Sequence, residues 1–445
     1  MTRHHGLPRL AALLVAGLAL SACDTARSVL GSSVQAGSPG FVRGFLGGIA
    51  TEEPAAALVG RQVLSSGGSA VDAAVAASFA LAVTLPSRVG LGGGGACLVF
   101  DPRRGEPEAV LFPAGARSSV PAGADRPAAL PMLARGLFAL HTRQTAGRPF
   151  EELMAPAEQL ARFGAPMSRA LHADLAAVQG PLFADPQARA VFGSAGGLVA
   201  VGDRFQNPSL SATLTALRVS GVGDLNQGTL ARRLEEAAPL AGAGAMTVEE
   251  LRPALPRVVR PIIADAGGGA RVAFLPESGA AAAAAFEALR TGTMPQPSGG
   301  LLPASAGLIV YDRTGMAVSC AFSMNNLFGT GRIAPGLGFL MAAAPNIGQV
   351  QPALLSGAIG YSPNLRAFRL AVAGSGQAAA PLAVAIPAAA QMLRDATAEA
   401  AIAAVPEPGR TQLGQCPRYL PGWEQLCTTL TDPRGAGVAL GATDR

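Results

Sequence analysis

Three polar residues in the second half of the chain, Ser305, Ser323 and Asn325, have the types and spacing that covalent catalysis needs. Ser305 sits just before a first apolar run, a tight turn occupies 312–315, and Ser323 and Asn325 sit at the end of a second apolar run. Strand, tight turn and strand predict a hairpin, which can place the three side chains at one end. Such a layout suits a chain that cuts itself before Ser305 and then uses the new N-terminal serine as its nucleophile.

The composition excludes several other kinds of site. The chain has 445 residues, of which 49% are hydrophobic, and this is ample for a large core. It contains no lysine, so its 34 basic residues are all arginine, and Schiff-base or P-loop lysines are excluded. The net charge is only +5 and the arginines are scattered, so we expect no nucleic-acid partner.

The glycine-rich segment 90–95 formally matches the dinucleotide-binding pattern G-x-G-x-x-G. A dinucleotide site requires that loop to follow a strand and to open a helix. Here a predicted helix precedes the loop and a predicted strand, 96–100, follows it, so we reject nucleotide binding. The cysteines and histidines also lack the spacing of a metal site, and we therefore expect neither a cofactor nor a metal.

The N-terminus has the pattern of a targeting segment. Arg3 and Arg9 supply positive charge, 10–20 is apolar, and Ser-Ala-Cys follows directly, which resembles a bacterial lipoprotein signal. The resemblance implies a signal peptide at 1–22, a lipid on Cys23 and a flexible Gly/Ser-rich tether at 23–50. The expected location is the bacterial cell envelope, with the protein lipid-anchored and facing the periplasm; an ordinary secretory signal is the alternative.

The remaining cysteines fall into two kinds of surroundings. Cys416 and Cys427 bracket a short loop with two prolines, and in an exported protein this favours a local disulfide. Cys97 and Cys320 lie in apolar, strand-like runs, and we predict that both are buried thiols.

Hydrophobic spacing predicts helices that enclose a set of mixed strands. No linker is long enough to separate two domains, so we expect one α+β body with helix, sheet, sheet and helix layers. The predicted helices are two in 52–82, several in 130–235, and one each at 247–250, 279–289 and 381–394; the further predicted strands are 271–275, 338–342 and 368–373.

From about residue 50 to the end, short motifs follow one another in a characteristic order. They are 67–77, 92–94, 156–164, 202–210, 312–315, 325–331 and 431–435. In this order they resemble the gamma-glutamyltransferase family of N-terminal-nucleophile hydrolases. The resemblance implies a four-layer αββα sandwich, with a large-chain region at 51–304 and a small-chain region at 305–445.

The resemblance also implies a mechanism. The precursor cuts itself before Ser305, and the freed α-amine, with a pKa of about 7.7–8.0 in model compounds, acts as base for the hydroxyl. Ser323 is implied as a second hydroxyl that supports the nucleophile, and Asn325 as the residue that holds the substrate's α-amine. The family's oxyanion-hole glycines fall on Gln377 and the next residue, directly after Gly376, so we assign Gly376 and Gln377 to substrate binding.

Several other family positions are changed, and these changes concern substrate recognition. A carboxylate enclosed without a cation or donors is costly, so glutathione-type recognition is expected to be weakened or lost. The family's carboxylate-binding arginine is replaced by Pro113, and Arg117 is close to that position but off register. The family's serine pair is replaced by Ile359 and Gly360, and its amine-binding acid and glutamine are replaced by Ile347 and Ala344. The Thr and His that follow the family's nucleophile are replaced by Ala306 and Gly307.

Three functions remain open at this stage. The first is a gamma-glutamyltransferase or hydrolase that acts on glutathione or related gamma-glutamyl compounds. The second is a related amidase or acylase with the same nucleophile and a different, more apolar acyl pocket. The third is a catalytically inactive, membrane-tethered scaffold or binding protein.

Overall fold

The computed structural model describes residues 44–117, 119–144, 147–297 and 304–441. The predicted signal peptide, Cys23 and most of the predicted tether lie outside these residues. Gly47–Thr51 is strand β1, which pairs with the strand that begins at Ser305, so the tether's predicted end at residue 50 is too late. Among the described residues, we find no helix with the length and apolar character needed to cross a bilayer.

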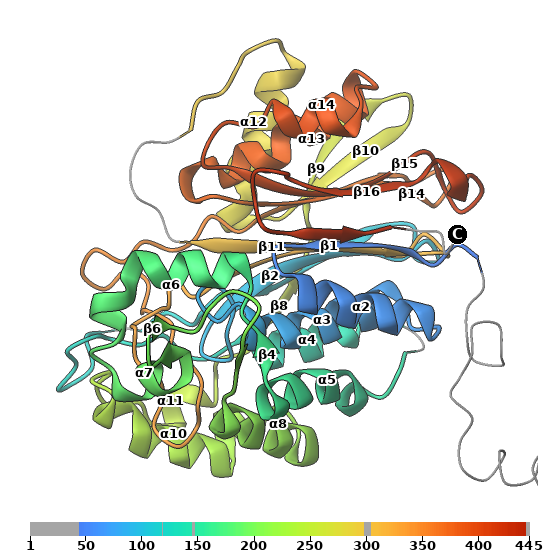
Figure 1. Cartoon of the computed structure of the whole chain (residues 1–445). Coiled ribbons are helices and arrows are strands. Elements are labelled where there is room, and N and C mark those ends of the chain that lie inside the picture. Colours follow the sequence, from blue (N-terminus) through green and yellow to red (C-terminus); the bar gives the residue numbers. More distant parts are fainter. Residues whose placement is uncertain (1–43, 118, 145–146, 298–303, 442–445) are drawn as a thin grey trace, which may run out of the picture. The chain divides into compact units, whose positions relative to one another are not determined.

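Two antiparallel sheets lie face to face between two layers of helices, which is the αββα arrangement expected from the sequence (Figure 1). One sheet has seven strands in the order β17, β1, β11, β12, β2, β3, β8, and the other has six in the order β16, β15, β14, β13, β10, β9. The strands are β1 Gly47–Thr51, β2 Gly94–Phe100, β3 Pro107–Phe112, β8 Arg257–Val259, β9 Ile262–Gly267, β10 Ala270–Phe274, β11 Ser305–Asp312, β12 Ala317–Ser323, β13 Ser356–Ser362, β14 Ala367–Ser375, β15 Arg410–Leu420, β16 Thr428–Thr431 and β17 Val438–Leu440.

Helices on the side of the seven-stranded sheet come from residues 54–251, and those on the six-stranded sheet come from residues 280–403 (Figure 1). The first group comprises α2 Pro54–Ser65, α3 Ala70–Thr84, α4 Leu133–His141, α5 Phe150–Phe163, α6 Arg169–Leu182, α7 Pro186–Phe192, α8 Pro208–Ser220, α9 Asp224–Gln227, α10 Thr229–Leu240 and α11 Val248–Leu251. The second group comprises α12 Ala280–Arg290, α13 Ala380–Leu393 and α14 Ala398–Ala403. Two small two-stranded sheets are formed by β4 Ala165–Pro166 with β7 Arg204–Phe205 and by β5 Gly193–Ser194 with β6 Gly197–Leu198.

Helix α3 is the central support of the seven-stranded sheet, and every one of its residues is buried. It begins with a capping box, because the Ser69 hydroxyl accepts from the Asp72 N–H while the Asp72 carboxylate accepts from the Ser69 N–H, both at 3.0 Å. The helix is rich in alanine, whose small side chain lets neighbouring elements approach closely. Its dense burial therefore fixes the sheet that carries Ser305.

Two sequence-based predictions about this body are wrong. Cys97 and Cys320 are not free thiols but form a disulfide, because they face each other directly on β2 and β12 although they lie 223 residues apart in sequence. Residues 338–342 form only isolated bridges rather than a strand. The reason is local: Gly336 and Gly338 have φ of +71° and +76°, and these left-handed conformations turn the chain there.

Candidate active site

The predicted hairpin is formed by β11 and β12, and it places Ser305 directly opposite Ser323. Directly opposed residues in an antiparallel pair project to the same face of the sheet, so the two hydroxyls are neighbours. The connecting turn is fixed by Asp312, whose carboxylate accepts from both the backbone N–H and the hydroxyl of Thr314, at 2.8 and 2.6 Å. Asp312 also accepts from the Ala70 N–H at 2.8 Å, which ties the turn to helix α3.

Ser323 contacts the peptide bond that precedes Ser305. Its hydroxyl donates to the carbonyl oxygen of Ala304 at 2.7 Å and accepts from the backbone N–H of Asn325 at 2.8 Å. The hydroxyl of Ser305 is buried, with the residue only 2% exposed, and it has no hydrogen-bond partner. An unpaired buried hydroxyl costs about 1–3 kcal/mol, so its position beside the bound Ala304 carbonyl requires an explanation.

Asn325 lies at the same end of the hairpin but turns away from the cavity beside Ser305. It has φ of +65°, and its side-chain amide donates to the carbonyl oxygen of Ala343 at 2.7 Å. The neighbouring Asn326, not Asn325, contributes to the cavity lining. The structure thus brings together Ser305, Ser323, Gly376 and Gln377 at one end of the sheets, with the Asn325 amide facing the loop at Ala343.

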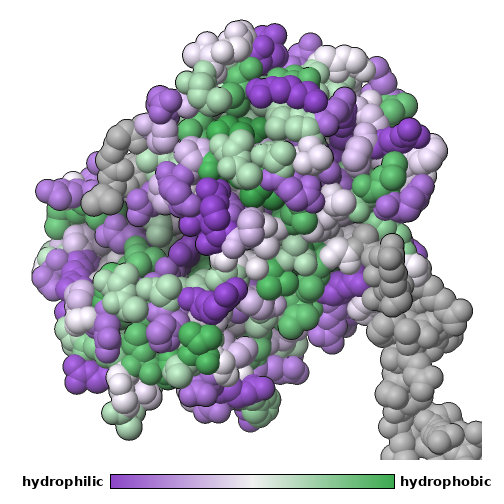
Figure 2. All heavy atoms as spheres, turned by 45° about the horizontal axis from the view of Figure 1, so that its top comes forward, coloured by the Kyte–Doolittle hydropathy of each residue, from purple (hydrophilic) through white to green (hydrophobic). Residues whose placement is uncertain are grey.

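A cavity of about 440 Å³ opens beside Ser305, a size in the usual range for small-molecule sites. Most of its lining side chains are polar, which differs from the apolar pocket considered for an acylase. Figure 2 shows hydrophilic residues around a hollow on the face it presents. The lining residues are Arg88, Asp174, Ala304, Ser305, Asn326, Leu327, Gln349, Gln351, Ser375, Gly376, Gln377, Pro408 and Arg410.

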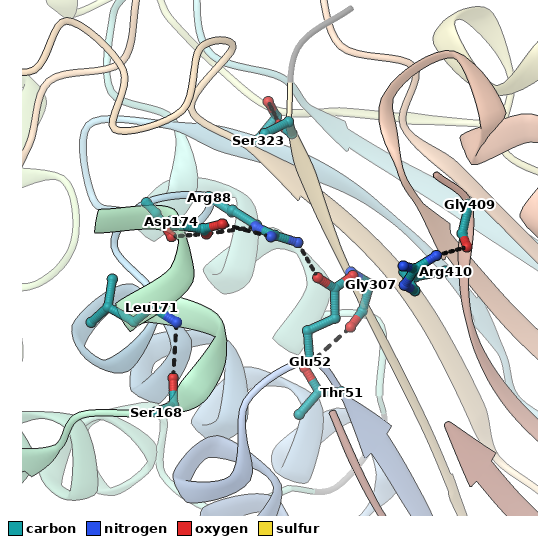
Figure 3. A network of polar contacts seen from close by, with 12 residues as sticks. Thr51, Glu52, Arg88, Ser168, Leu171, Asp174, Gly307, Ser323, Gly409 and Arg410 are labelled. Atoms are coloured by element: carbon teal, nitrogen blue, oxygen red, sulfur yellow. Dashed lines mark hydrogen bonds and ion pairs between the residues drawn. The ribbon is translucent and has the colours of Figure 1, made fainter. Parts of the chain in front are cut away.

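A chain of ion pairs supports the strand that carries Ser305 (Figure 3). Glu52 accepts from the Gly307 N–H at 3.1 Å and from Arg88 Nη1 at 2.7 Å, and Arg88 Nε and Nη2 each donate to Asp174 at 2.8 Å. Burial by itself lowers the pKa of Arg88, but the two carboxylates outweigh burial and raise that pKa above its ordinary value. Arg88 therefore stays charged and joins β11 to helix α6.

The opposite side of the cavity is built from the six-stranded sheet. Ser375 ends β14 and pairs directly with Arg410 of β15, and Gly376 and Gln377 follow with φ of +104° and +55°. A side chain at Gly376 is excluded, because a Cβ there would lie 2.3 Å from the carbonyl oxygen of Pro408. The left-handed turn therefore requires glycine, and it brings Gln377 into the cavity lining.

None of the positions at which the family's carboxylate clamp was expected lines this cavity. Ile359 is fully buried in β13, and Arg117 is held by Glu250 through a 2.7 Å ion pair. Sequence reasoning instead missed Arg88, Asp174, Ser375 and Arg410, among others. For Arg88 a signal existed, since a lone arginine stands between an apolar helix and a glycine-rich turn.

Disulfides occur in two places among the described residues. Cys416 and Cys427 are joined across the short loop between β15 and β16, the pairing that the sequence favoured. The second bond, Cys97–Cys320, lies inside the seven-stranded sheet, and its Cys320 is three residues before Ser323 on β12.

Comparison with known proteins first defines the class of fold. The structure is similar to the crystal structure of cephalosporin acylase from Bacillus halodurans, with a TM-score of 0.71 over 93% of this chain and 99% of that one, at 19% sequence identity. With the αββα layers and a buried serine at the start of a central strand, this is the fold of the N-terminal-nucleophile hydrolases.

The family follows from sequence. The profile described as Gamma-glutamyltranspeptidase matches residues 56–298, more than half of the chain, and the chain belongs to that family. It is 30% identical over 216 residues to glutathione hydrolase 2 of Arabidopsis thaliana, which covers 46% of this chain and 37% of that protein. It is likewise 30% identical over 230 residues to the glutathione hydrolase proenzyme of Escherichia coli, and this match covers 47% of this chain and 39% of that protein. The matched part thus spans under half the length of these relatives.

Proposed function

We propose that this protein is an amide hydrolase or acyl transferase of the gamma-glutamyltransferase type, activated by self-cleavage between Ala304 and Ser305. Its proposed donors are glutathione or related gamma-glutamyl compounds. One observation carries the proposal: the Ser305 hydroxyl is buried and unpaired in the cavity, while Ser323 donates to the carbonyl oxygen of the peptide that would be cut.

Self-cleavage needs a nucleophile and a donor on the developing oxyanion. The Ser305 oxygen attacks the Ala304 carbonyl carbon, and the hydroxyl of Ser323 stabilises the negative charge on the carbonyl oxygen. Breakage of the amide bond gives an ester and frees the Ser305 amine, which takes up the hydroxyl proton. Water then hydrolyses the ester, leaving a carboxylate on Ala304 and restoring the serine hydroxyl.

The freed amine gives Ser305 its own base. A terminal amine titrates close to neutral pH and can take the hydroxyl proton as the oxygen attacks a donor amide in the cavity. Gln377 and Ala378 stand at the start of the turn into α13, where the first backbone N–H groups have no helical partner and can donate to the oxyanion. The acyl group then passes from serine to water or to an amine.

A related amidase or acylase is the second candidate, because the expected clamp positions do not reach the cavity. Both candidates use the same nucleophile and differ in the acyl group they accept.

We also propose, from the pattern at 1–23, that the protein is exported to the cell envelope and anchored by lipid at Cys23. Export is compatible with two disulfides, which persist in oxidising compartments.

Intact mass spectrometry of the reduced, denatured protein tests the proposal. The wild type should give two chains that part between Ala304 and Ser305, Ser305→Ala should stay whole, and Ser305→Thr, which keeps a hydroxyl, should split. An unbroken wild-type chain contradicts the proposal and favours an inactive scaffold. Release of p-nitroaniline from a gamma-glutamyl anilide by the split protein then separates the two enzymatic candidates.

A further inference from the structure

We propose that Arg410 and Ser375 form a clamp for a carboxylate of the acyl donor, on the side of the cavity that faces Ser305. The inference deepens the proposed function and rests on it. It names residues other than those on which the family resemblance places a carboxylate-binding arginine and a serine pair.

The two side chains belong together geometrically. Ser375 and Arg410 are directly opposed on β14 and β15, so both project to the same face of the six-stranded sheet. Both line the cavity that contains Ser305. The packing of the sheets supports this placement, since a Cβ on Gly307 of β11 would lie 3.1 Å from the Cβ of Ala373 of β14. The ends of β11 and β14 therefore form facing sides of one cavity.

Ser375 has a donor that the protein leaves unused. The residue is 1% exposed, and its hydroxyl makes no hydrogen bond with any described residue. Leaving a buried hydroxyl unpaired costs about 1–3 kcal/mol. Beside it in the same cavity, the only other buried side-chain atom without a partner among the described residues is the hydroxyl of Ser305. If Ser305 supplies the nucleophile, Ser375 remains available to bind a substrate oxygen.

Arg410 has free donors as well. Its Nη1 donates to Glu407 and to the carbonyl oxygen of Gly409, both at 2.7 Å, whereas Nε and Nη2 make no hydrogen bond with the described residues. An Nε–Nη edge presents two parallel donors and matches the two oxygens of a carboxylate. The side chain is 24% exposed, so a ligand can reach it.

Arg88, the other cation of this cavity, is less suited to the role. It is paired with two carboxylates that are nearly buried, Glu52 and Asp174, so an incoming anion would meet a net negative group. Arg410 is paired with Glu407, whose side chain is 59% exposed and therefore well screened by water. The positive end of the cavity thus lies at Arg410.

Three p-nitroanilides test the clamp. The gamma-glutamyl compound has an α-carboxylate and an α-amine, the glutaryl compound keeps only the carboxylate, and the 4-aminobutyryl compound keeps only the amine. We expect Arg410→Gln to lower kcat/KM about 10- to 100-fold for the two carboxylate donors, mostly through KM, and to leave the third unchanged. Ser375→Ala should give the same pattern with a loss of about 2- to 10-fold. Arg369→Gln is the matched control, since Arg369 lies on β14 but pairs with Asp395 outside this cavity.

Equal losses on all three donors, or no loss on any, would overturn the clamp. Scission is measured first in every variant, and a wild type that stays whole refutes the proposed function rather than the clamp.

If the wild type splits but cleaves none of the anilides, thermal shifts replace turnover. Glutarate should then stabilise the wild type but not Arg410→Gln, and glutaramide, which lacks the charge, should stabilise neither. If Arg410→Gln does not fold, Arg410→Lys, which keeps the charge without the fork, should give an intermediate loss.

A separate observation supports a second inference: we infer that the two chains remain covalently joined after self-cleavage. Cys97 precedes the proposed cut and Cys320 follows it, and their disulfide is fully buried between β2 and β12. Cys416 and Cys427 both follow the cut, so their bond joins no separate chains. The Cys97–Cys320 bond therefore links the large-chain and small-chain regions.

Mass spectrometry with and without reductant tests this link, after alkylation of free thiols in denaturant. Split wild-type protein should give one species without reductant, heavier than the precursor by one water, and two chains with it. Cys97→Ser with Cys320→Ser should give two chains in both conditions, whereas Cys416→Ser with Cys427→Ser should match the wild type. Wild-type chains that separate without reductant refute the link, and a single species of precursor mass in both conditions refutes self-cleavage instead.

Discussion

The two sides of the cavity are built in different ways. Ser305 and Ser323 stand on one hairpin in the middle of the seven-stranded sheet, with the Glu52–Arg88–Asp174 ion pairs beneath. Ser375 and Arg410 stand at the end of the six-stranded sheet, next to a left-handed turn at Gly376. The first side is fixed by the register of two strands that a short turn connects, and the second combines the pairing of β14 with β15 with one left-handed turn.

This difference suggests a division of work between the sides. On the side of the hairpin β11–β12, here called the hairpin side, Ser323 donates a hydrogen bond to the carbonyl oxygen of the peptide before Ser305. We therefore expect scission to depend on the hairpin side, and donor recognition to depend on the side formed by Ser375 and Arg410. Changes on each side should separate these two activities.

The largest effect is expected from Ser323→Ala. This change removes the donor to the Ala304 carbonyl oxygen, and loss of one oxyanion donor slows acyl chemistry about 100- to 1,000-fold. Ser323→Thr keeps the hydroxyl and should split at close to the normal rate. The appearance of the small chain over time, followed by intact mass, measures both rates. Equal rates in Ser323→Ala and wild type would show that the hydroxyl does not act on this carbonyl.

Arg88→Met should have the next largest effect, and this effect should be a lower free energy of unfolding. It leaves Glu52 and Asp174 as nearly buried carboxylates without their cation, which costs about 3 kcal/mol in the free energy of unfolding. Denaturant unfolding of the unsplit Ser305→Ala background measures the loss without interference from scission. Arg104→Met, at an exposed pair with Glu108, should change stability by less than about 0.5 kcal/mol. A loss of that small size in Arg88→Met would mean that the ion pairs do not support the hairpin.

The sequence predicted the hairpin side because its signals are local. An apolar run, a turn at Asp312–Gly315 and a second apolar run determine both the hairpin and its register, and so bring Ser305 opposite Ser323. The order of the family's motifs predicted the αββα layers, and the gamma-glutamyltranspeptidase profile matches a range that contains many of the helices packed on the seven-stranded sheet.

The other side could not be predicted in the same way. Ser375 and Arg410 are 35 positions apart and meet only because β14 and β15 pair around helix α13. Cys97 and Cys320 show the same difficulty, since their contact depends on the order of strands in the sheet and not on either local sequence. The family resemblance also put one position of the serine pair at Ile359, which the structure buries in the core.

Gly376→Ala should have a smaller effect, and one confined to donor turnover. The added Cβ meets the Pro408 carbonyl oxygen at 2.3 Å, and a left-handed backbone at a non-glycine residue costs about 1–3 kcal/mol. The turn should shift and displace Gln377, so kcat/KM falls while the scission rate stays near normal. Gly422→Ala is the control, because Gly422 also has a positive φ, of +131°, but nothing lies within 4 Å of its Cβ position. Slower scission in Gly376→Ala would contradict the division between the two sides.

The smallest effect concerns a buried acid behind the hairpin side. Glu53 caps helix α2, accepting from the Ala56 N–H at 2.8 Å and from the Thr84 hydroxyl at 2.6 Å. Burial raises the pKa of this carboxyl, and the hydrogen bonds from Thr84 and Ala56 only partly oppose that rise. The folded state thus favours the protonated acid, and the stability it contributes is complete below the ordinary pKa of about 4.5 and is lost as pH rises through the raised value.

Glu53→Gln keeps an oxygen for the cap and removes the titration. Its free energy of unfolding relative to wild type should therefore rise as the pH is raised above about 4.5, and it should level off once the pH has passed the raised pKa of Glu53, in the unsplit Ser305→Ala background. Urea unfolding at several pH values measures the difference, and Glu151→Gln, at an exposed position in α5, should show little of it. A difference in the free energy of unfolding that is constant with pH would mean that burial does not raise the pKa of Glu53.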